Sequence, residues 1–191
     1  FHLFNQTLLK TSGRQKMNAF VSPLSVHIAL NMLVNGAEGA TRTDILKTLE
    51  SDSYPIEQLN DHLKELSNAL ISADPSSCFS IANSIWCANS FPVKNAFTQT
   101  NKTYYDSEVN TIDFTSPDAI KTINTWCAQK TNNTIPKALD ELNPHSMMLL
   151  INALYFKGYW YQGFQFNENM TTKEPFHAKD GSSENVDMMH S

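Results

Sequence analysis

The sequence has few of the residues that build linkers, and it lacks the basic clusters that bind nucleic acid. Glycine and proline number 6 and 8 in 191 residues, which is too few for a disordered or linker-rich chain. The formal net charge is −5, and no group of lysine and arginine is interleaved with aromatic residues, so nucleic acid is not an expected partner. With 41% hydrophobic residues, the chain can bury a substantial core as one compact unit.

Long hydrophobic runs are also missing. The longest nearly uninterrupted apolar run, Met147 to Phe156, is about half of what a membrane-spanning helix requires, so no membrane association is expected. No signal peptide is visible. The chain begins at Phe1, in what reads as the middle of a helix, which leaves room for a targeting segment ahead of it.

Cysteine is scarce and does not follow a metal, redox or disulfide pattern. The chain has three cysteines, Cys78, Cys87 and Cys127. Their odd number favours buried free thiols over a disulfide framework, so the cellular compartment stays open. The six histidines show no close ligand spacing, so no metal site is expected. Cys127 with His145 is a conceivable nucleophile and base, but Cys127 lies on the apolar stripe of its helix, where an inert core thiol is expected.

The motifs of common enzyme classes are absent as well. The sequence has no Gly-rich phosphate loop, no G-x-S-x-G elbow and no paired-carboxylate motif. We therefore expect no enzyme, no catalytic residue and no cofactor. What the chain does contain is a set of strong signals for helices and strands.

The segment that carries most information runs from Asn18 to Leu49, NAFVSPLSVHIALNMLVNGAEGATRTDILKTL. Ser22 stands where the N-cap of a helix belongs, Pro23 occupies the first helical position, and Gly36 lies just past the end. Eight of the twelve residues between Pro23 and Gly36 are apolar, and only Ser25, His27 and Asn31 are polar before the last position. We therefore expect this helix to be buried on nearly all sides.

The rest of the chain reads as helices first and strands later, which predicts an α+β fold. Thr41 and Asp44 predict a capping box at the start of a second helix. The further expected elements, in chain order, are an amphipathic helix from Pro55 to Ser72, a strand over Phe79–Ala88, a helix over Val93–Tyr104, a strand over Val109–Phe114, a helix after the N-cap signal at Ser116, a strand from Met147 and short antiparallel strands beyond Phe164.

Asn152 is the sharpest single residue of the sequence. It interrupts a run of Met, Leu, Ile, Ala and Phe that should be buried on both faces, where an unpaired amide would cost about 1–3 kcal/mol. It must therefore have hydrogen-bond partners, and the hydroxyls at the start of the helix at Ser22 are the ones we expect. We predict Asn152 on a central strand with its side chain near that helix, in a structural hydrogen-bonding role.

Several segments, in a consistent order, resemble the serpin family of serine protease inhibitors. The run from Asn18 is similar to the family's N-x-F-x-S-P-x-S strand and its buried helix ending in G-A-x-G-x-T, and MMLLINALYFKGYW, from Met147, is similar to L-x-N-A-x-Y-F-K-G-x-W. Shorter matches are FSIANSIW from Phe79, TINTWCAQKTNN from Thr122, TKEPFH from Thr172 and VDMM from Val186. The resemblance covers essentially the whole chain.

The resemblance implies the serpin fold, in which a layer of helices accompanies a large central, mostly antiparallel sheet A and the smaller sheets B and C. It also implies roles for four residues. Ser22, Ser25 and Asn152 match the shutter, where two strands of sheet A part, and Trp160 matches a tryptophan of the breach at the top of that sheet. These residues would form a mechanical latch and no catalytic site.

Because a serpin is about twice as long as this chain, the resemblance implies that residues 1–191 are the N-terminal half of one serpin domain. The reactive-centre loop, the strand after it and the histidine expected to pair with Asn152 would then lie beyond Ser191. The second half would be needed for a complete fold. An extracellular or secreted protein is expected from the family, with an intracellular one left open.

The function that the resemblance implies is inhibition of a target protease, an endopeptidase of the serine or cysteine class, as a suicide substrate. The protease cleaves the reactive-centre loop, which then inserts into sheet A as an extra strand. We expect the strand from Met147 to flank the insertion gap, and the helix from Pro117 to Thr131 to be displaced as the gap opens. The alternative is a non-inhibitory serpin that acts as a chaperone or small-ligand carrier.

One segment departs from the family pattern, and one helix argues against a partner that some serpins bind. The usual T-N-G-K-I is replaced by TNNTI at Thr131–Ile135, so Asn133 must supply the left-handed backbone conformation that glycine would adopt. The third helix, Pro55–Ser72, carries Lys64 against three acidic residues. Activation by heparin through that helix is therefore not expected.

Overall fold

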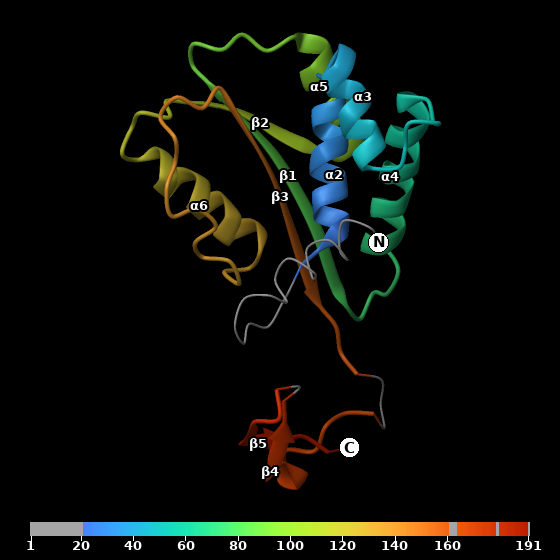
Figure 1. Cartoon of the computed structure of the whole chain (residues 1–191), viewed down its shortest axis with the longest axis vertical. Coiled ribbons are helices and arrows are strands. Elements are labelled where there is room, and N and C mark those ends of the chain that lie inside the picture. The colour runs from blue at the N-terminus through green and yellow to red at the C-terminus, as the bar shows by residue number, and fades with distance from the viewer. Residues whose placement is uncertain (1–20, 161–163, 179, 191) are drawn as a thin grey trace. The chain divides into compact units, whose positions relative to one another are not determined.

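The computed structural model describes residues 21–160, 164–178 and 180–190. These residues fall into two units, Phe1–Lys157 and Gly158–Ser191, and each unit is described by itself. Labels follow Figure 1. The helix expected at Phe1 and the short strand expected from Asn18 lie outside the described residues.

Residues 21–157 of the first unit form helices and three strands. Its helices are α2 (Pro23–Val34), α3 (Gly39–Thr48), α4 (Ile56–Ile71), α5 (Asn95–Tyr105) and α6 (Ala119–Lys130), and its strands are β1 (Cys78–Ala88), β2 (Ser107–Ile112) and β3 (Met148–Lys157). The strands form one sheet in the order β2-β1-β3. β1 runs parallel to β2 and antiparallel to β3, with Cys78 opposite Lys157 and Cys87 opposite Met148.

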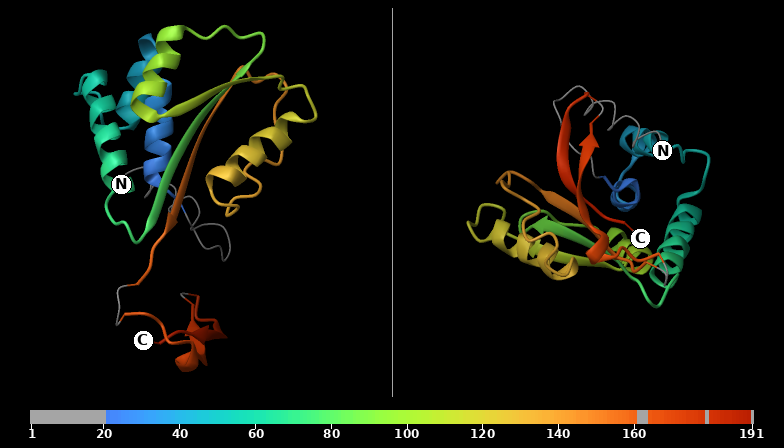
Figure 2. Two further views of the ribbon diagram at one scale, coloured as in Figure 1. Left: turned by 180° about the vertical axis from the view of Figure 1, so that it is seen from behind. Right: turned by 90° about the horizontal axis from the view of Figure 1, so that it is seen from below.

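Both faces of this sheet are covered. The sequence predicted this, because apolar residues in β3 follow one another without alternating with polar ones. Helix α6 lies on one side of the three strands, and α2, α4 and α5 lie on the other (Figures 1 and 2). Each side has its own core. The core under α6 contains Trp86, Phe114, Ile123, Trp126, Cys127 and Ala153. The core on the opposite face contains Ile28, Met32, Leu63, Ile85, Cys87, Phe97 and Tyr105.

Helix α2 begins where the sequence predicts. Ser22 is the N-cap, and its hydroxyl accepts a hydrogen bond from the backbone N–H of Ser25 at 3.3 Å. The expected burial on nearly all sides is only partly met, because Val26 and Leu33 remain 43% and 36% exposed. One apolar face of the helix is therefore uncovered among the described residues.

Gly36 follows α2 for a steric reason. A Cβ atom at this position would lie 2.7 Å from the ring of Phe97 on α5, closer than side-chain atoms approach one another. The glycine thus lets the end of α2 pack directly against an aromatic ring of the core.

Two helix starts differ from the prediction. Helix α3 begins at Gly39, its N-cap Glu38 makes no side-chain cap, and Thr41 and Asp44 lie inside the helix, so the capping box is wrong. Helix α6 begins at Ala119, after a turn in which the Ser116 carbonyl accepts from the Ala119 N–H at 3.1 Å. The Ser116 signal thus marks a turn that precedes the helix, because the hydroxyl bonds only the N–H of Asp118.

The turn after α6 forms without the family glycine. Asn132 and Asn133 adopt φ angles of +50° and +60°, in the left-handed region that asparagine tolerates better than most residues. The N–H of Asn133 donates to the carbonyl of Ala128 at 2.8 Å, and this bond closes the helix.

The second unit is a small hairpin. A short 3-10 helix, η1 (Glu168–Met170), precedes the antiparallel strands β4 (Thr172–His177) and β5 (Ser183–Met188). Gly181 takes a φ of +81° in the connecting turn, a backbone conformation that glycine adopts readily. The short antiparallel strands expected beyond Phe164 are thus present.

Candidate functional site

The predicted site residue Asn152 lies on β3 and faces a second asparagine across the sheet. Asn152 is opposite Asn83 of β1, and its Nδ2 donates to Asn83 Oδ1 at 2.7 Å. Side chains alternate along a strand, so both amides point to the face that carries Ile85 and Leu150, the face of the sheet that α2 covers. Asn152 was predicted on a central strand with its side chain near the helix that begins at Ser22, and its side chain does lie on the face that this helix covers.

The expected partners of Asn152 are wrong. Ser22 and Ser25 bond each other, with the Ser25 hydroxyl donating to Ser22 Oγ at 3.0 Å, and neither bonds Asn152. β3 is also an outer strand of the three described, whereas β1 is the central one. Oδ1 of Asn152 is buried and has no hydrogen-bond partner among the described residues. Of the two polar atoms of the Asn152 amide, Nδ2 is therefore hydrogen-bonded and Oδ1 is not.

Asn83 is the site residue that sequence reasoning missed. It is buried, its Oδ1 accepts from Asn152, and its Nδ2 donates to the backbone carbonyl of Tyr105 at 2.7 Å. The signal was present in FSIANSIW, where an asparagine interrupts an apolar strand as Asn152 interrupts β3. Which two asparagines pair depends on strand register, which links residues 69 positions apart and is not visible in either segment alone.

A polar cluster continues from Asn83 away from β3. The hydroxyl of Tyr105, at the end of α5, donates to Asn60 Oδ1 on α4 at 2.6 Å. Asn60 and Asn35 exchange two hydrogen bonds, at 2.9 and 3.1 Å. Because burial raises the pKa of the Tyr105 phenol, the hydroxyl stays protonated and remains a donor.

The polar contacts between helix α6 and the sheet lie near the C-terminal end of the helix. The indole rings of Trp86 on β1 and Trp126 on α6 meet edge to face, with centroids 6.3 Å apart. Glu108 of β2 accepts from Trp126 Nε1 at 2.9 Å and pairs with Lys130. The hydrogen bond from Lys130 holds the pKa of the Glu108 carboxyl below its usual range.

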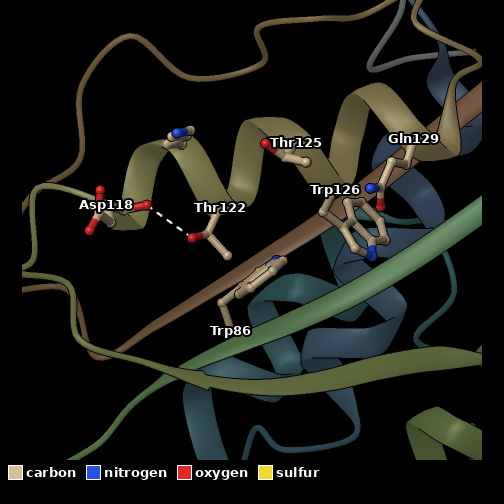
Figure 3. A pocket seen from close by; sticks show the side chains of 7 residues that line it. Trp86, Asp118, Thr122, Thr125, Trp126 and Gln129 are labelled. Atoms are coloured by element: carbon tan, nitrogen blue, oxygen red, sulfur yellow. Dashed lines mark hydrogen bonds between the residues drawn. The ribbon is translucent and has the colours of Figure 1, made fainter.

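A groove of about 630 Å³ opens where α6 meets β1 (Figure 3). Its floor includes Trp86, and its remaining lining comes from α6: Asp118, Lys121, Thr122, Thr125, Trp126 and Gln129. The Thr122 hydroxyl donates to the carbonyl of Asp118 at 3.0 Å, so it is engaged within its own helix. Helix α6 therefore contacts the sheet but leaves an open groove beside Trp86.

Trp160, the predicted breach residue, belongs to the second unit. It is 62% exposed, and its ring meets Phe166 edge to face with centroids 5.5 Å apart. Ser22, Ser25 and Asn152 belong to the first unit. The structure thus describes Trp160 separately from the other three predicted site residues.

The remaining chemical candidates are the cysteines and possible metal ligands. No disulfide links Cys78, Cys87 and Cys127. Cys87 and Cys127 are buried free thiols, as predicted, and burial raises the pKa of both thiols, which disfavours a reactive thiolate. The expected burial is wrong for Cys78, which is exposed at the first position of β1. Among residues 21–160, 164–178 and 180–190, no three His, Cys, Asp or Glu side chains gather as a metal site. No helix in that part of the chain has the length and apolar character needed to span a bilayer.

The family model described as "Serpin (serine protease inhibitor)" matches residues 1–191, and the chain belongs to the serpin family. The sheet with helices on both faces is accordingly part of the α+β serpin fold. Serpins are protease inhibitors rather than enzymes in the catalytic sense.

Individual serpins match almost all of this chain and about half of their own. Serpin-ZX of Arabidopsis thaliana is 34% identical over 188 residues, covering 95% of this chain and 47% of that protein. Human neuroserpin is 32% identical, covering 95% and 44%. Arabidopsis AtSerpin1 in its native stressed conformation has a TM-score of 0.83 at 30% identity, covering 99% and 50%. A thyroxine-binding globulin complex with thyroxine has a TM-score of 0.88 at 26% identity, covering 99% and 52%.

Proposed function

We propose that residues 1–191 are the N-terminal half of a single serpin domain whose full-length form inhibits a serine or cysteine endopeptidase as a suicide substrate. The observation that carries this proposal is the outer edge of β3. No described strand pairs with that edge, although β3 is covered on both faces and lies beside a buried polar pair. An edge of this kind can accept a further strand, which is what loop insertion requires.

Ser22, Ser25 and Asn152 are proposed as the shutter, together with Asn83. The unpartnered Oδ1 of Asn152 supports this role, because a buried acceptor needs a donor and the family resemblance supplies a histidine from the second half. Trp160 is proposed as the breach residue on the resemblance alone. The latch would hold the sheet closed until a protease cleaves the loop.

The displacement of α6 is part of the same proposal. The helix lies over the face of the sheet that must widen, and the groove beside Trp86 leaves part of its length unpacked. Its main polar attachment is the contact of Glu108 with Trp126 and Lys130. Because the core under α6 is separate from the core on the opposite face of the sheet, the helix can move without dismantling the latter.

The proposal is tested with the full-length protein and a panel of serine and cysteine proteases. Formation of an SDS-resistant 1:1 complex with at least one protease is the expected result, because the acyl-enzyme is trapped once the loop inserts. Cleavage of the loop by a non-target protease should in addition raise the melting temperature, since the inserted strand completes the sheet. A protein that is cut without forming a complex and without gaining stability is not inhibitory.

The second candidate is a non-inhibitory serpin that carries a small ligand or acts as a chaperone. The likeness to thyroxine-binding globulin with thyroxine bound favours keeping it, because that serpin fold holds a small molecule. Absence of any protease complex, combined with saturable binding of a hydrophobic ligand such as thyroxine, would select this candidate.

The cellular location is proposed from the family resemblance. We propose an extracellular or secreted protein, and export of the full-length protein from its own cells would test this.

We propose no heparin acceleration through α4, because Lys64 is outnumbered by Glu57, Asp61 and Glu65 on that helix. Retention of the full-length protein on immobilised heparin at physiological salt, lost on Lys64→Ala, would contradict that statement.

A further inference from the structure

Five residues form one continuous hydrogen-bonded polar chain between the helices and the proposed shutter. Asn35 at the end of α2 bonds Asn60 on α4, and Asn60 Oδ1 accepts from the hydroxyl of Tyr105. The carbonyl of Tyr105 accepts from Asn83, and Asn83 accepts from Asn152. This polar chain joins α2, α4, the end of α5, β1 and β3 within the face of the sheet that α2 covers.

The polar chain has a fixed direction, because a backbone carbonyl can only accept a hydrogen bond. The amide of Asn83 must therefore present Nδ2 to the Tyr105 carbonyl and Oδ1 to Asn152. Asn152 must then donate through Nδ2, which leaves Oδ1 as its open atom. Turning either amide round would place two donors or two acceptors face to face in a buried site.

The far end of the polar chain is fixed in the same way. Asn35 Nδ2 donates both to the carbonyl of Asn31 in the last turn of α2 and to Asn60 Oδ1, each at 3.1 Å, while Asn35 Oδ1 accepts from Asn60 Nδ2 at 2.9 Å. Asn60 in turn offers its oxygen to the Tyr105 hydroxyl, which is buried and stays protonated. Tyr105 is thus held by its hydroxyl on one side and by its carbonyl on the other.

We infer that Asn83 is a positioning residue of the shutter and that it takes its orientation from the end of α5, which α4 holds through Tyr105. This inference rests on the proposed function. It gives the group that meets Asn152 a defined chemistry: it must be a hydrogen-bond donor, because the polar chain leaves only an acceptor open. It also makes the contact between α4 and α5 a determinant of how readily the sheet opens at β3.

The test uses substitutions in the full-length protein that alter the polar chain at two distances from Asn152. Asn83→Asp keeps the acceptor for Asn152 but cannot donate to the Tyr105 carbonyl. Its control is Asn101→Asp on α5. Asn101 is also buried, and its Nδ2 donates to the Phe97 carbonyl outside the polar chain. Both substitutions bury a carboxylate, so both should lower the melting temperature.

The distant substitution is Tyr105→Phe, which removes only the hydroxyl bonded to Asn60. Its matched control is Tyr104→Phe, whose hydroxyl lies outside the polar chain. The measurement is the half-time of polymerisation on native gels, taken the same interval below each variant's own melting temperature. General loss of stability is thereby removed from the comparison.

We expect Asn83→Asp and Tyr105→Phe to shorten this half-time about fivefold, the effect of one lost hydrogen bond, while both controls leave it unchanged. Equal half-times for the two variants and their controls would overturn the inference while leaving the shutter proposal intact, provided Asn152→Ala still accelerates polymerisation. If Asn152→Ala also behaves like the controls, the shutter assignment itself is wrong.

Discussion

Asn152 has two polar atoms in different surroundings. Its Nδ2 is bonded to Asn83, whereas its Oδ1 is buried without a partner among the described residues. Asn152→Ala in the full-length protein removes the donor and leaves Asn83 Oδ1 unpaired, at a cost of about 1–3 kcal/mol. We expect a lower melting temperature and faster polymerisation.

Recognition of the target protease should be unchanged in this variant, because the substitution does not touch the reactive-centre loop. The rate of loop cleavage by a non-target protease is the control. Melting and polymerisation that both match the unsubstituted protein would count against a shutter role for Asn152.

Gly36 supplies a second prediction about a single residue. Gly36→Ala places a Cβ atom 2.7 Å from the ring of Phe97, so the end of α2 must shift or the ring must move. Overpacking of this kind costs about 1–3 kcal/mol. Urea denaturation should reveal the loss, and Phe97→Leu added to Gly36→Ala should recover part of it. A double variant as unstable as the sum of the two single variants would refute the steric explanation.

The contrast between Ser22 and Asn152 explains how much of the candidate site the sequence could predict. Ser22 was recognised as an N-cap because its signal is local: a serine, a proline and an apolar run in sequence. The need of Asn152 for a partner was equally visible, but the partner was not. Asn83 lies 69 residues away, and only the register of β1 with β3 brings the two amides together.

Among the helices and strands, those with a strong period were predicted best. α4 agrees with the sequence to within one residue at each end, because its three-to-four spacing extends over its whole length. β1 and α5 agree to within two residues. The predicted caps of α3 and α6 were wrong, because Thr41 lies inside α3 and Ser116 lies in a turn that precedes α6. A serine or threonine hydroxyl indicates a helix start only when the next residue is the first residue of the helix.

The attachment of α6 provides a prediction for one helix. Glu108→Gln keeps an acceptor for Trp126 Nε1 but removes the ion pair with Lys130. We expect faster limited proteolysis in residues 132–147, which follow α6, and a loss of about 0.5 kcal/mol in unfolding free energy, because the ion pair is partly exposed. The control is Glu38→Gln, which breaks the highly exposed pair with Lys94 and should change neither quantity.

The pH dependence of this effect has a defined sign. The pKa of Glu108 is lower in the folded protein than its ordinary value, so the pair adds stability above that ordinary value. This stability is lost as the pH falls through the lowered pKa. Glu108→Gln should therefore differ from the unsubstituted protein at pH 7 and approach it below about pH 4. An undiminished difference at pH 3.5 would show that the ion pair is not the cause.

For the molecule as a whole, the described residues leave much apolar surface uncovered. Val26 and Leu33 on α2 are exposed, the outer edge of β3 is unpaired by any described strand, and the chain spans about half the length of the curated relatives it matches. We expect residues 1–191 expressed alone to aggregate and to inhibit no protease. Sedimentation velocity and a protease panel measure both properties.

Adding the second half as a separate chain during refolding is the corresponding control, and it should restore solubility. A soluble, cooperatively melting monomer of residues 1–191 that forms an SDS-resistant complex with a protease would contradict the proposal that the inhibitory loop lies elsewhere.

The edge-to-face pair of Trp86 and Trp126 has a practical consequence. One indole belongs to the sheet and the other to α6, and the third tryptophan of the chain, Trp160, is largely exposed. Coupled electronic transitions of two indoles 6.3 Å apart contribute to near-ultraviolet circular dichroism, and this contribution disappears when the rings separate. The protein therefore carries its own optical reporter of α6 lifting from the sheet, with no label to be introduced.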